Sequence, residues 1–277
     1  MAAPVPGGTF AGRVALVTGA SRGLGRVMAM ALAEAGAIVV ATAKGDRAGL
    51  EALAADCPGR VHPMLSDAGD PEACQKLVVE THARFGGLDI LVLNAGIGMI
   101  HVKPDYRTAP PRFWEVVPAQ WQRVLAVNLV GPFALAAAAV PGMLAKGWGR
   151  VITIGTGHGT MVRAHYAPYG PSKAGLEAAT VIWAKDLAGT GVTVNCLLPG
   201  GATDTEFMPA ELRARPGSGL LDPAIMAAPV LWLAGTDSDG VTGRRIVARR
   251  WAQGLDAALS DAGWGPGGAP AGSDPST

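Results

Sequence analysis

The sequence predicts an α/β fold, a single doubly wound parallel sheet of about seven strands with helices on both faces. Short apolar runs alternate with helical stretches along most of the chain, from residue 14 to residue 248. A glycine-rich turn joins the first apolar run to the first helix. Polar and glycine residues follow several of the runs, and ligands bind at the carboxyl ends of parallel strands.

The first half of the chain alternates strand and helix without a break. The expected strands are residues 14–18, 38–41, 61–65 and 88–93, and the expected helices are residues 27–35, 50–55 and 71–85. Pro71 stands in the first turn of its helix, where a missing N–H costs nothing. Such a series gives parallel strands joined by right-handed crossovers, so the strand ends share one edge of the sheet.

The second half continues the alternation with longer helices. Strands are expected at residues 150–154, 192–198 and 244–248, and helices at residues 118–146, 169–187 and 223–234. The helix at 118–146 is expected to be bent or interrupted near Gly131-Pro132 and Pro141, because proline lacks an N–H. Residues 97–117 form a long irregular loop, either a substrate wall or a surface embellishment, and residues 203–215 a flap with a short helix.

Composition and charge narrow the partners. The 277 residues carry a net charge of +1, so no nucleic-acid partner is expected. Cys57, Cys74 and Cys196 lack metal or redox spacing, which indicates reduced buried thiols, no metal site and a cytoplasmic protein. Between Arg123 and Lys146 lie 22 uncharged residues, long enough to span a bilayer. Their polar and proline residues and their place in the alternation favour a buried helix, so no membrane partner is expected.

Domain organisation is expected to be simple. No signal peptide, internal repeat or second domain is recognised, so residues 1–277 are expected to form one domain. Its ordered part is expected to cover about residues 10–252. The Gly/Pro/Ser-rich residues 253–277 are expected to be a flexible tail.

The glycine-rich turn, Gly19-Ala-Ser-Arg-Gly23-Leu-Gly25, has the layout of a nucleotide site. Glycines let the backbone approach a pyrophosphate, and the following helix N-terminus offers free N–H groups and a partial positive charge. The spacing Gly-x3-Gly-x-Gly differs from the commoner Gly-x-Gly-x-x-Gly. A tight turn without a ligand is the alternative, and the strand before and the helix after it favour the nucleotide.

The end of the second strand indicates which nucleotide. Sites for NAD usually place an acid there to hold the ribose 2′-hydroxyl, but this strand ends in Thr42-Ala43-Lys44. Arg22 in the glycine turn is a second cation. Two cations favour a 2′-phosphate and hence NADP(H). NAD stays open as the alternative, because Lys44 could be merely solvated and Asp46 follows closely.

Tyr169 and Lys173 stand four residues apart at the start of a predicted helix, with Pro168 and Pro171 in its first turn. Residues at this spacing lie on one helix face. The ammonium group can therefore lie near the phenol and favour its anion. This pair is suited to moving a proton onto or off an oxygen.

The motifs, taken in chain order, resemble those of the short-chain dehydrogenase/reductase family over roughly residues 10–250. They are Thr18-Gly-Ala-Ser-Arg-Gly-Leu-Gly25, Asn94-Ala95-Gly96, Asn128, Thr156, Tyr169-x3-Lys173 and Pro199-Gly200. The resemblance implies a Rossmann-like sheet of order 3-2-1-4-5-6-7 and a catalytic Asn-Ser-Tyr-Lys set. Thirteen residues before the tyrosine, where the family usually has serine, this chain has Thr156. Threonine keeps the hydroxyl and adds a methyl group.

The resemblance also implies residue roles. NADPH gives a hydride to a carbonyl carbon, Tyr169 donates a proton to its oxygen, and Thr156 holds that oxygen. Lys173 lowers the tyrosine pKa and binds the nicotinamide ribose, and Asn128 supports a proton-relaying water. The implied cofactor-binding residues are Gly19, Ser21, Arg22, Gly23, Leu24, Gly25, Lys44, Asp67 (at the adenine), Asn94, Ala95, Gly96, Tyr169, Lys173, Pro199, Gly200, Ala202 and Thr205. The alternatives are that Asn128 merely bends its helix and that Asp67 caps one.

The expected function is an NADP(H)-dependent oxidoreductase that reduces a ketone, aldehyde or 3-oxoacyl group to an alcohol, or the reverse. An NAD-dependent alcohol or polyol dehydrogenase and a non-catalytic nicotinamide-binding sensor or scaffold are the alternatives. The expected apolar pocket walls are Ile97, Met99, Ile100, Met161, Phe207 and Met208. His158 and His165 are expected to be exposed loop residues. The resemblance implies a homodimer or homotetramer, although the arginine-rich residues 244–250 replace the family's usual Asp-Gly-Gly and leave the assembly open.

Overall fold

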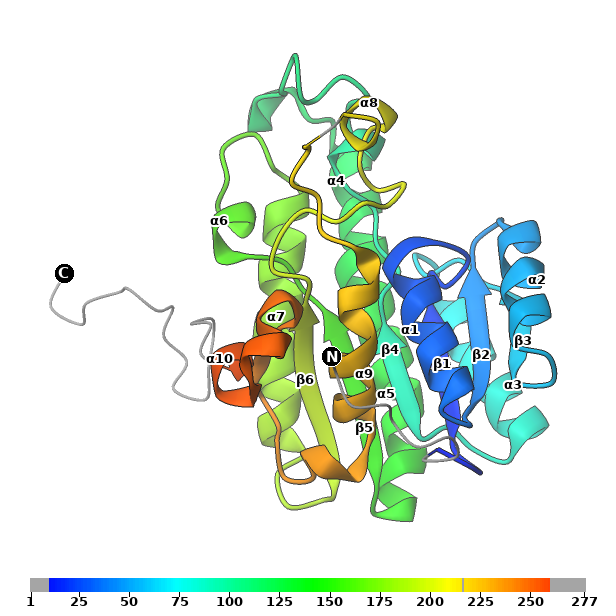
Figure 1. Cartoon of the computed structure of the whole chain (residues 1–277). Coiled ribbons are helices and arrows are strands. Elements are labelled where there is room, and N and C mark those ends of the chain that lie inside the picture. Colours follow the sequence, from blue (N-terminus) through cyan, green and yellow to red (C-terminus); the bar gives the residue numbers. More distant parts are fainter. Residues whose placement is uncertain (1–9, 216, 260–277) are drawn as a thin grey trace, which may run out of the picture.

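Seven parallel strands form one sheet in the order β3-β2-β1-β4-β5-β6-β7, which confirms the predicted fold class and strand order. The computed structural model describes residues 10–215 and 217–259 (Figure 1). The strands are β1 (Val14–Thr18), β2 (Ile38–Ala43), β3 (Val61–Leu65), β4 (Ile90–Leu93), β5 (Gly149–Ile154), β6 (Val192–Leu198) and β7 (Arg245–Val247). Each predicted strand is present, with ends that shift by two residues or fewer.

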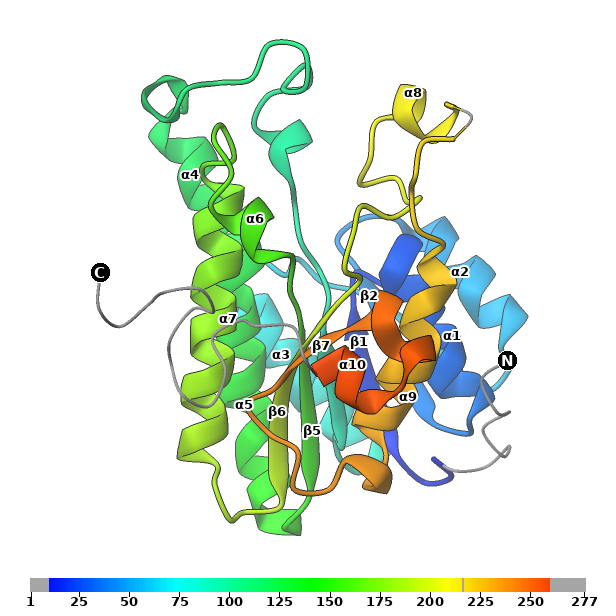
Figure 2. The ribbon, with the colours of Figure 1, turned by 60° about the vertical axis from the view of Figure 1, so that its left-hand side comes forward.

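Helices cover both faces of the sheet, as predicted. One layer is α1 (Gly23–Glu34), α2 (Arg47–Asp56) and α9 (Ala227–Ala234), and the other is α3 (Pro71–Phe85), α5 (Gly131–Lys146) and α7 (Tyr169–Asp186). Figure 2 shows the sheet between these two layers. The hydrophobic core has two parts, one on each face of the sheet, because successive side chains of a strand point to opposite faces.

The long apolar stretch is one helical rod with a wide turn inside it. α4 (Pro118–Leu125) passes through a π-helical turn, Ala126–Val130, into α5. The expected irregularity near Gly131-Pro132 is therefore this turn, which ends just before the proline. An interruption at Pro141 does not occur, since α5 continues through it. Ala139 and Met143, which flank the proline, are fully buried, so packing outweighs the local helix penalty.

This rod, Pro118–Lys146, is the only helix among the described residues that is long and apolar enough to cross a membrane. Half of its most apolar 18-residue stretch is buried inside the protein. Its α5 part contributes Leu135, Ala139 and Met143 to the core beneath the sheet. In this structure it is a core-covering helix, as the sequence indicated.

Three irregular segments stand above the carboxyl ends of the strands (Figure 2). The first is the loop of residues 97–117, which contains two short 3-10 turns, Met99–His101 and Phe113–Glu115. The second follows β5 and includes α6 (His158–Met161). The third follows β6 and carries α8 (Ala210–Arg213), the expected short helix of the flap. These segments enclose the region where ligands of parallel sheets bind.

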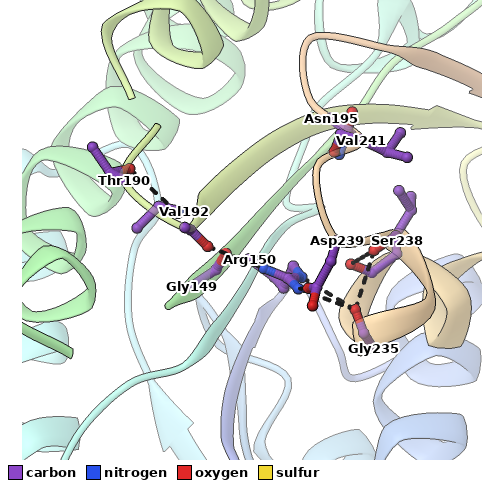
Figure 3. Close-up of polar contacts among 11 residues, drawn as sticks. Gly149, Arg150, Thr190, Val192, Asn195, Gly235, Ser238, Asp239 and Val241 are labelled. Carbon is purple, nitrogen blue, oxygen red and sulfur yellow. Dashed lines mark hydrogen bonds and ion pairs between the residues drawn. The ribbon is translucent and has the colours of Figure 1, made fainter. Parts of the chain in front are cut away.

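The opposite end of the sheet is held by a buried arginine. Arg150, at the start of β5, is 1% exposed and donates to the carbonyls of Gly149, Gly191 and Gly235 and to the Asp239 carboxylate (Figure 3). This ion pair satisfies a charge that would be costly to bury alone. The cluster joins β5 to the segment after α9, far along the strand from the cleft.

The described structure continues beyond the expected end of the ordered part at residue 252. Residues Leu255–Leu259 form the short helix α10, and its Ala258 is fully buried against β7 and the turn after it. The expected tail therefore does not begin at residue 253. Its remainder, residues 260–277, lies outside the described residues.

Candidate active site

A cleft of about 900 Å³ runs across the carboxyl ends of the strands. Its walls come from the ends of β1, β2, β4, β5 and β6 and from the three irregular segments above them. Every residue predicted to bind cofactor, together with Thr156, lies on its wall. Asn128 does not line the cleft and is buried directly behind it.

Two glycines of the turn, Gly19 and Gly25, occupy positions where a side chain would not fit. A Cβ on Gly25 would lie 2.1 Å from the Gly19 carbonyl oxygen, and Gly19 has the left-handed φ of 64°. Helix α1 starts at Gly23, four residues before the predicted start, and its first turn faces the cleft. This helix has no side-chain cap, so its first N–H groups remain available to a ligand.

The end of β4 is tied to the glycine turn. The Asn94 amide donates to the carbonyls of Thr18 and Gly19 at 2.9 and 3.1 Å. The Thr18 hydroxyl in turn accepts from the backbone N–H groups of Asn94 and Ala95. Asn94 therefore holds two strand ends in register under the cleft floor, which fixes the backbone that Ala95 and Gly96 expose to a ligand.

Charged side chains gather at the end of the cleft beside β2 and β3. Lys44 pairs with Asp67 at 2.7 Å, and Arg123 approaches the same carboxylate at 3.7 Å. Burial raises the pKa of Asp67, but these partners and the Gly69 N–H lower it by more, so the net pKa is below its usual range. Asp67 does not cap α3, because Asp70 fills that position.

Two further groups at this end suit a nucleotide. Arg22 lines the cleft and has no ion-pair partner among the described residues. The buried Ser66 hydroxyl, on the same wall, has no hydrogen-bond partner in the described part of the chain. Asp46 caps α2 through Gly49 and is hydrogen-bonded by Ser21, so this acid is already engaged. The uncapped glycine turn, the Arg22 guanidinium and the orphaned Ser66 hydroxyl therefore fit a dinucleotide cofactor.

Tyr169 lies at the other end of the cleft with its phenol beside the Thr156 hydroxyl. Burial raises the pKa of Tyr169 well above its ordinary value, and the hydrogen bond with Thr156 opposes that rise without cancelling it. The phenol is therefore neutral at physiological pH and can act as a proton donor. The threonine at the family's serine position keeps the expected hydroxyl in contact with the tyrosine.

Lys173 lies one turn along α7 from Tyr169 but does not hydrogen-bond it. Its ammonium donates to the Ile154 carbonyl at 2.8 Å. Burial lowers the pKa of Lys173 to about 8. The simple expectation that the ammonium lies against the phenol and lowers the pKa of Tyr169 is therefore not seen in this state, because the β5 carbonyl holds it.

Asn128 sits in the π-helical turn and is fully buried. Its side chain accepts from the Ile97 N–H at 2.8 Å and donates to the Ile97 carbonyl and the Ser172 hydroxyl, each at 3.0 Å. This clamp joins the loop after β4 to α7. Asn128 is thus more than a residue that bends its helix, and π-helical turns of this kind are frequent at functional sites.

A buried ion pair supports the loop that carries Thr156. Arg245 of β7 donates to the Glu177 carboxylate at 3.0 Å and to the Thr156 carbonyl at 2.7 Å. Both charged side chains are less than 5% exposed. The arginine that departs from the family pattern therefore holds the backbone of a predicted catalytic residue.

The substrate end of the cleft is aromatic and partly apolar. Ile97, Met99, Phe207 and Met208 line it as expected, whereas Ile100 and Met161 do not. The Tyr169 and Phe207 rings are 5.8 Å apart between centroids. The first part of the 97–117 loop is therefore a cleft wall, while Phe113 and Trp114 farther along it are exposed. Neither His158 nor His165 lines the cleft, and His165 contacts the Pro111 carbonyl.

Sequence reasoning missed several residues at the site. Arg245 and Glu177 support it from below, Tyr106, Arg107, Arg163 and Tyr166 line its substrate end, and Ser172 and Arg123 contact predicted site residues. One signal was available, because the chain has three tyrosines and all of them line the cleft. No cluster of three or more metal-ligating side chains occurs in residues 10–215 and 217–259.

Comparisons with known proteins find a matching family model and similar sequences. The family model described as short chain dehydrogenase matches residues 13–215. The 3-oxoacyl-[acyl-carrier-protein] reductase FabG of Vibrio cholerae is 35% identical over 85% of this chain and 95% of its own length. The D-beta-hydroxybutyrate dehydrogenase of Rhizobium meliloti is 30% identical over 84% of this chain and 96% of its own.

Solved structures give the same result. A metagenomic short-chain oxidoreductase in complex with NADP superimposes with a TM-score of 0.72 at 29% identity, covering 86% of this chain and 97% of its own. A dehydrogenase/reductase from Sinorhizobium meliloti 1021 gives 0.75 at 35% identity, over 86% and 94%. The chain therefore belongs to the short-chain dehydrogenase/reductase family of oxidoreductases.

Proposed function

We propose that the protein is an NADP(H)-dependent reductase that converts a ketone, aldehyde or 3-oxoacyl group to an alcohol, or runs the reverse reaction. The observation that carries this proposal is the buried Tyr169 phenol, beside Thr156, in the same cleft as an uncapped glycine turn. Relatives named as a 3-oxoacyl reductase and a hydroxybutyrate dehydrogenase support the carbonyl/alcohol chemistry. A small-molecule substrate fits a cleft of about 900 Å³.

When bound, NADPH would supply a hydride to the carbonyl carbon. Tyr169 gives its proton to the carbonyl oxygen, and its raised pKa keeps that proton in place until the oxygen becomes basic. The Thr156 hydroxyl donates a hydrogen bond to the same oxygen as negative charge develops there. Lys173, with a pKa of about 8, would return a proton to Tyr169 after turnover through a bound water, because no direct hydrogen bond joins the two side chains. Asn128 holds the Ile97 backbone in place. In the proposed mechanism it would support a water that relays protons to Lys173.

The remaining predicted residues would bind the cofactor. Gly19, Gly23 and Gly25 would admit the pyrophosphate to the start of α1, with Ser21 and Leu24 beside it. Lys44 and Arg22 would contact the 2′-phosphate, and Asp67 the adenine. Asn94, Ala95 and Gly96 would support the ribose and nicotinamide, and Pro199, Gly200, Ala202 and Thr205 the carboxamide.

The wider predictions are part of the same proposal. We place the catalytic domain over the whole chain, in a cytoplasmic protein that forms a homodimer or homotetramer. Phe133 of α5 and Ile182 of α7 are each more than half exposed, which supports an apolar contact between copies on that helical layer. Size-exclusion chromatography with light scattering measures the assembly.

A matched pair of cofactors tests the proposal. The expected result is oxidation of NADPH by a panel of ketones, aldehydes and 3-oxoacyl thioesters, with kcat/KM at least tenfold higher for NADPH than for NADH. Lys44→Asp is expected to reverse this preference, because it replaces a phosphate partner with an acid that accepts from a 2′-hydroxyl. A wild-type preference for NADH would favour the NAD-dependent alcohol or polyol dehydrogenase instead. Cofactor binding without turnover of the whole panel, in either direction, would favour a sensor.

A further inference from the structure

The three tyrosines of the chain form a row along one wall of the cleft. The Tyr106 and Tyr166 ring centroids are 6.2 Å apart, and those of Tyr166 and Tyr169 are 6.4 Å apart, with both pairs edge to face. The Tyr106 and Tyr166 side chains are also close enough to interact electrostatically. Burial raises the pKa of Tyr166, so this ring is a neutral neighbour of the catalytic one. The row leads from Tyr169 away towards the loops above the sheet.

Two arginines lie at this row. The Arg163 guanidinium is stacked 4.9 Å from the Tyr166 ring centroid, and its Nη1 is 3.5 Å from the phenol oxygen. Arg107 is also close enough to act electrostatically on Tyr166. Both arginines line the cleft, and both are exposed. Arg163 therefore lies one aromatic ring away from Tyr169, and Arg107 directly follows Tyr106, the other ring that contacts Tyr166.

No acid balances this pair. In the described part of the chain neither Arg107 nor Arg163 has an ion-pair partner. The acids that line the cleft are engaged elsewhere. Asp46 caps α2, Asp67 pairs with Lys44 and Arg123, and Glu206 is 3.8 Å from Arg213 of the flap. The substrate end of the cleft thus carries an uncompensated positive charge, which attracts an anion and holds it best when the guanidinium groups can form charge-assisted hydrogen bonds.

The loops that carry the two arginines are fastened together. His165 Nδ1 lies 3.0 Å from the Pro111 carbonyl, and the Tyr106–Tyr166 contact joins the same two segments. Arg107 and Arg163 therefore come from different segments that meet over the cleft. Such an arrangement can hold an anion between them without ordering a free loop first.

We propose that the substrate is an anionic carbonyl compound, a keto acid whose carboxylate binds Arg163 and Arg107 while its ketone lies at Tyr169. This inference rests on the proposed reductase function and narrows it. One tyrosine separates Arg163 from the reacting oxygen, so a short chain of methylene groups joins the carboxylate to the ketone. A neutral ketone of equal length reaches Tyr169 but leaves both guanidinium groups without a partner.

Matched acids and esters test the proposal. NADPH oxidation is followed with 3-oxobutanoate, 4-oxopentanoate and 5-oxohexanoate and with the methyl ester of each. The expected result is a kcat/KM about tenfold to hundredfold higher for the best acid than for its ester. Arg107→Gln/Arg163→Gln is expected to remove most of this preference by lowering kcat/KM for the acid, while the ester changes by less than about twofold. Arg112→Gln removes the same charge from the exposed side of the loop and is expected to leave both unchanged.

A binding measurement separates this inference from the reductase function. Calorimetry on the NADPH-loaded protein is expected to detect hexanoate and not hexanamide, and the double variant is expected to lose hexanoate binding. Three results would each overturn the anion site. The first is that the esters react as well as the acids, and the second is that the double variant loses equally on both. The third is that hexanoate and hexanamide bind alike. If hexanoate binds as expected but no ketone is reduced, the reductase proposal fails and the anion site stands.

Discussion

Replacing Arg245 with methionine probes the support beneath Thr156. The guanidinium is 3.0 Å from the Glu177 carboxylate and 2.7 Å from the Thr156 carbonyl, and both charged groups are almost fully buried. Arg245→Met keeps most of the side-chain volume and removes both hydrogen bonds. Glu177 is then left as a buried carboxylate without its closest cation.

Breaking a buried pair from one side costs about 3–5 kcal/mol of unfolding free energy. For a protein of this size each kcal/mol lowers the melting temperature by roughly 2–4 °C, so the variant is expected to melt about 6–20 °C lower. Replacing both partners, as in Arg245→Met/Glu177→Leu, leaves no uncompensated charge and is expected to recover most of the loss. Urea unfolding of the wild type, the two single variants and the double variant measures the coupling between the residues.

Kinetics of the same variants isolate the link to catalysis. The double variant regains stability but still lacks the donor to the Thr156 carbonyl, so kcat is expected to stay about tenfold low while the KM for NADPH is unchanged. Arg244→Met, the neighbouring half-buried arginine, is the matched control. The reasoning is refuted if Arg245→Met unfolds within about 1 kcal/mol of the wild type, or if the double variant is no more stable than the single one.

The remaining predictions concern Thr156 and Lys173. Thr156→Ser is expected to keep activity within a few fold and Thr156→Val to lose about 10²-fold in kcat, since only the latter removes the donor to the carbonyl oxygen; equal losses in steady-state assays would show that the hydroxyl is unimportant. Burial holds the pKa of Lys173 near 8, below its ordinary value of 10.5, so between these values the unfolded chain keeps a proton that the native state releases. Wild-type stability relative to Lys173→Met is therefore expected to rise as the pH increases through this window. Urea unfolding at pH 7.5 and 9.5 checks the sign, and a fall would contradict the assignment.

The strands were predictable because their residues repeat a local pattern. Val14–Thr18, Val61–Leu65 and Val192–Leu198 are apolar runs bounded by turn residues, and these three strands have the predicted ends. The glycine turn and the Tyr169–Lys173 pair were also local, since their spacing along the chain already places them on one turn or one helix face.

The missed features depend on contacts between distant segments. Arg245 and Glu177 are separated by 68 positions, and nothing in either local sequence indicates that they meet. The π-helical turn carries Asn128, whose side chain makes hydrogen bonds to Ile97 and Ser172 on two other segments. Lys173 was expected beside the phenol because the spacing places both residues on one helix face. The spacing does not determine where a flexible ammonium group points, and here it donates to a β5 carbonyl.

The central claim is that Tyr169 donates the proton to the substrate oxygen. Tyr169→Phe keeps the ring and its contacts with Tyr166 and Phe207 and removes only the hydroxyl. The measurement is single-turnover oxidation of bound NADPH by the best carbonyl substrate, with NADPH binding followed in parallel by fluorescence. The predicted result is unchanged NADPH affinity with the rate of oxidation at least about 10³-fold lower. Oxidation at the wild-type rate by a variant that still binds NADPH would contradict the claim.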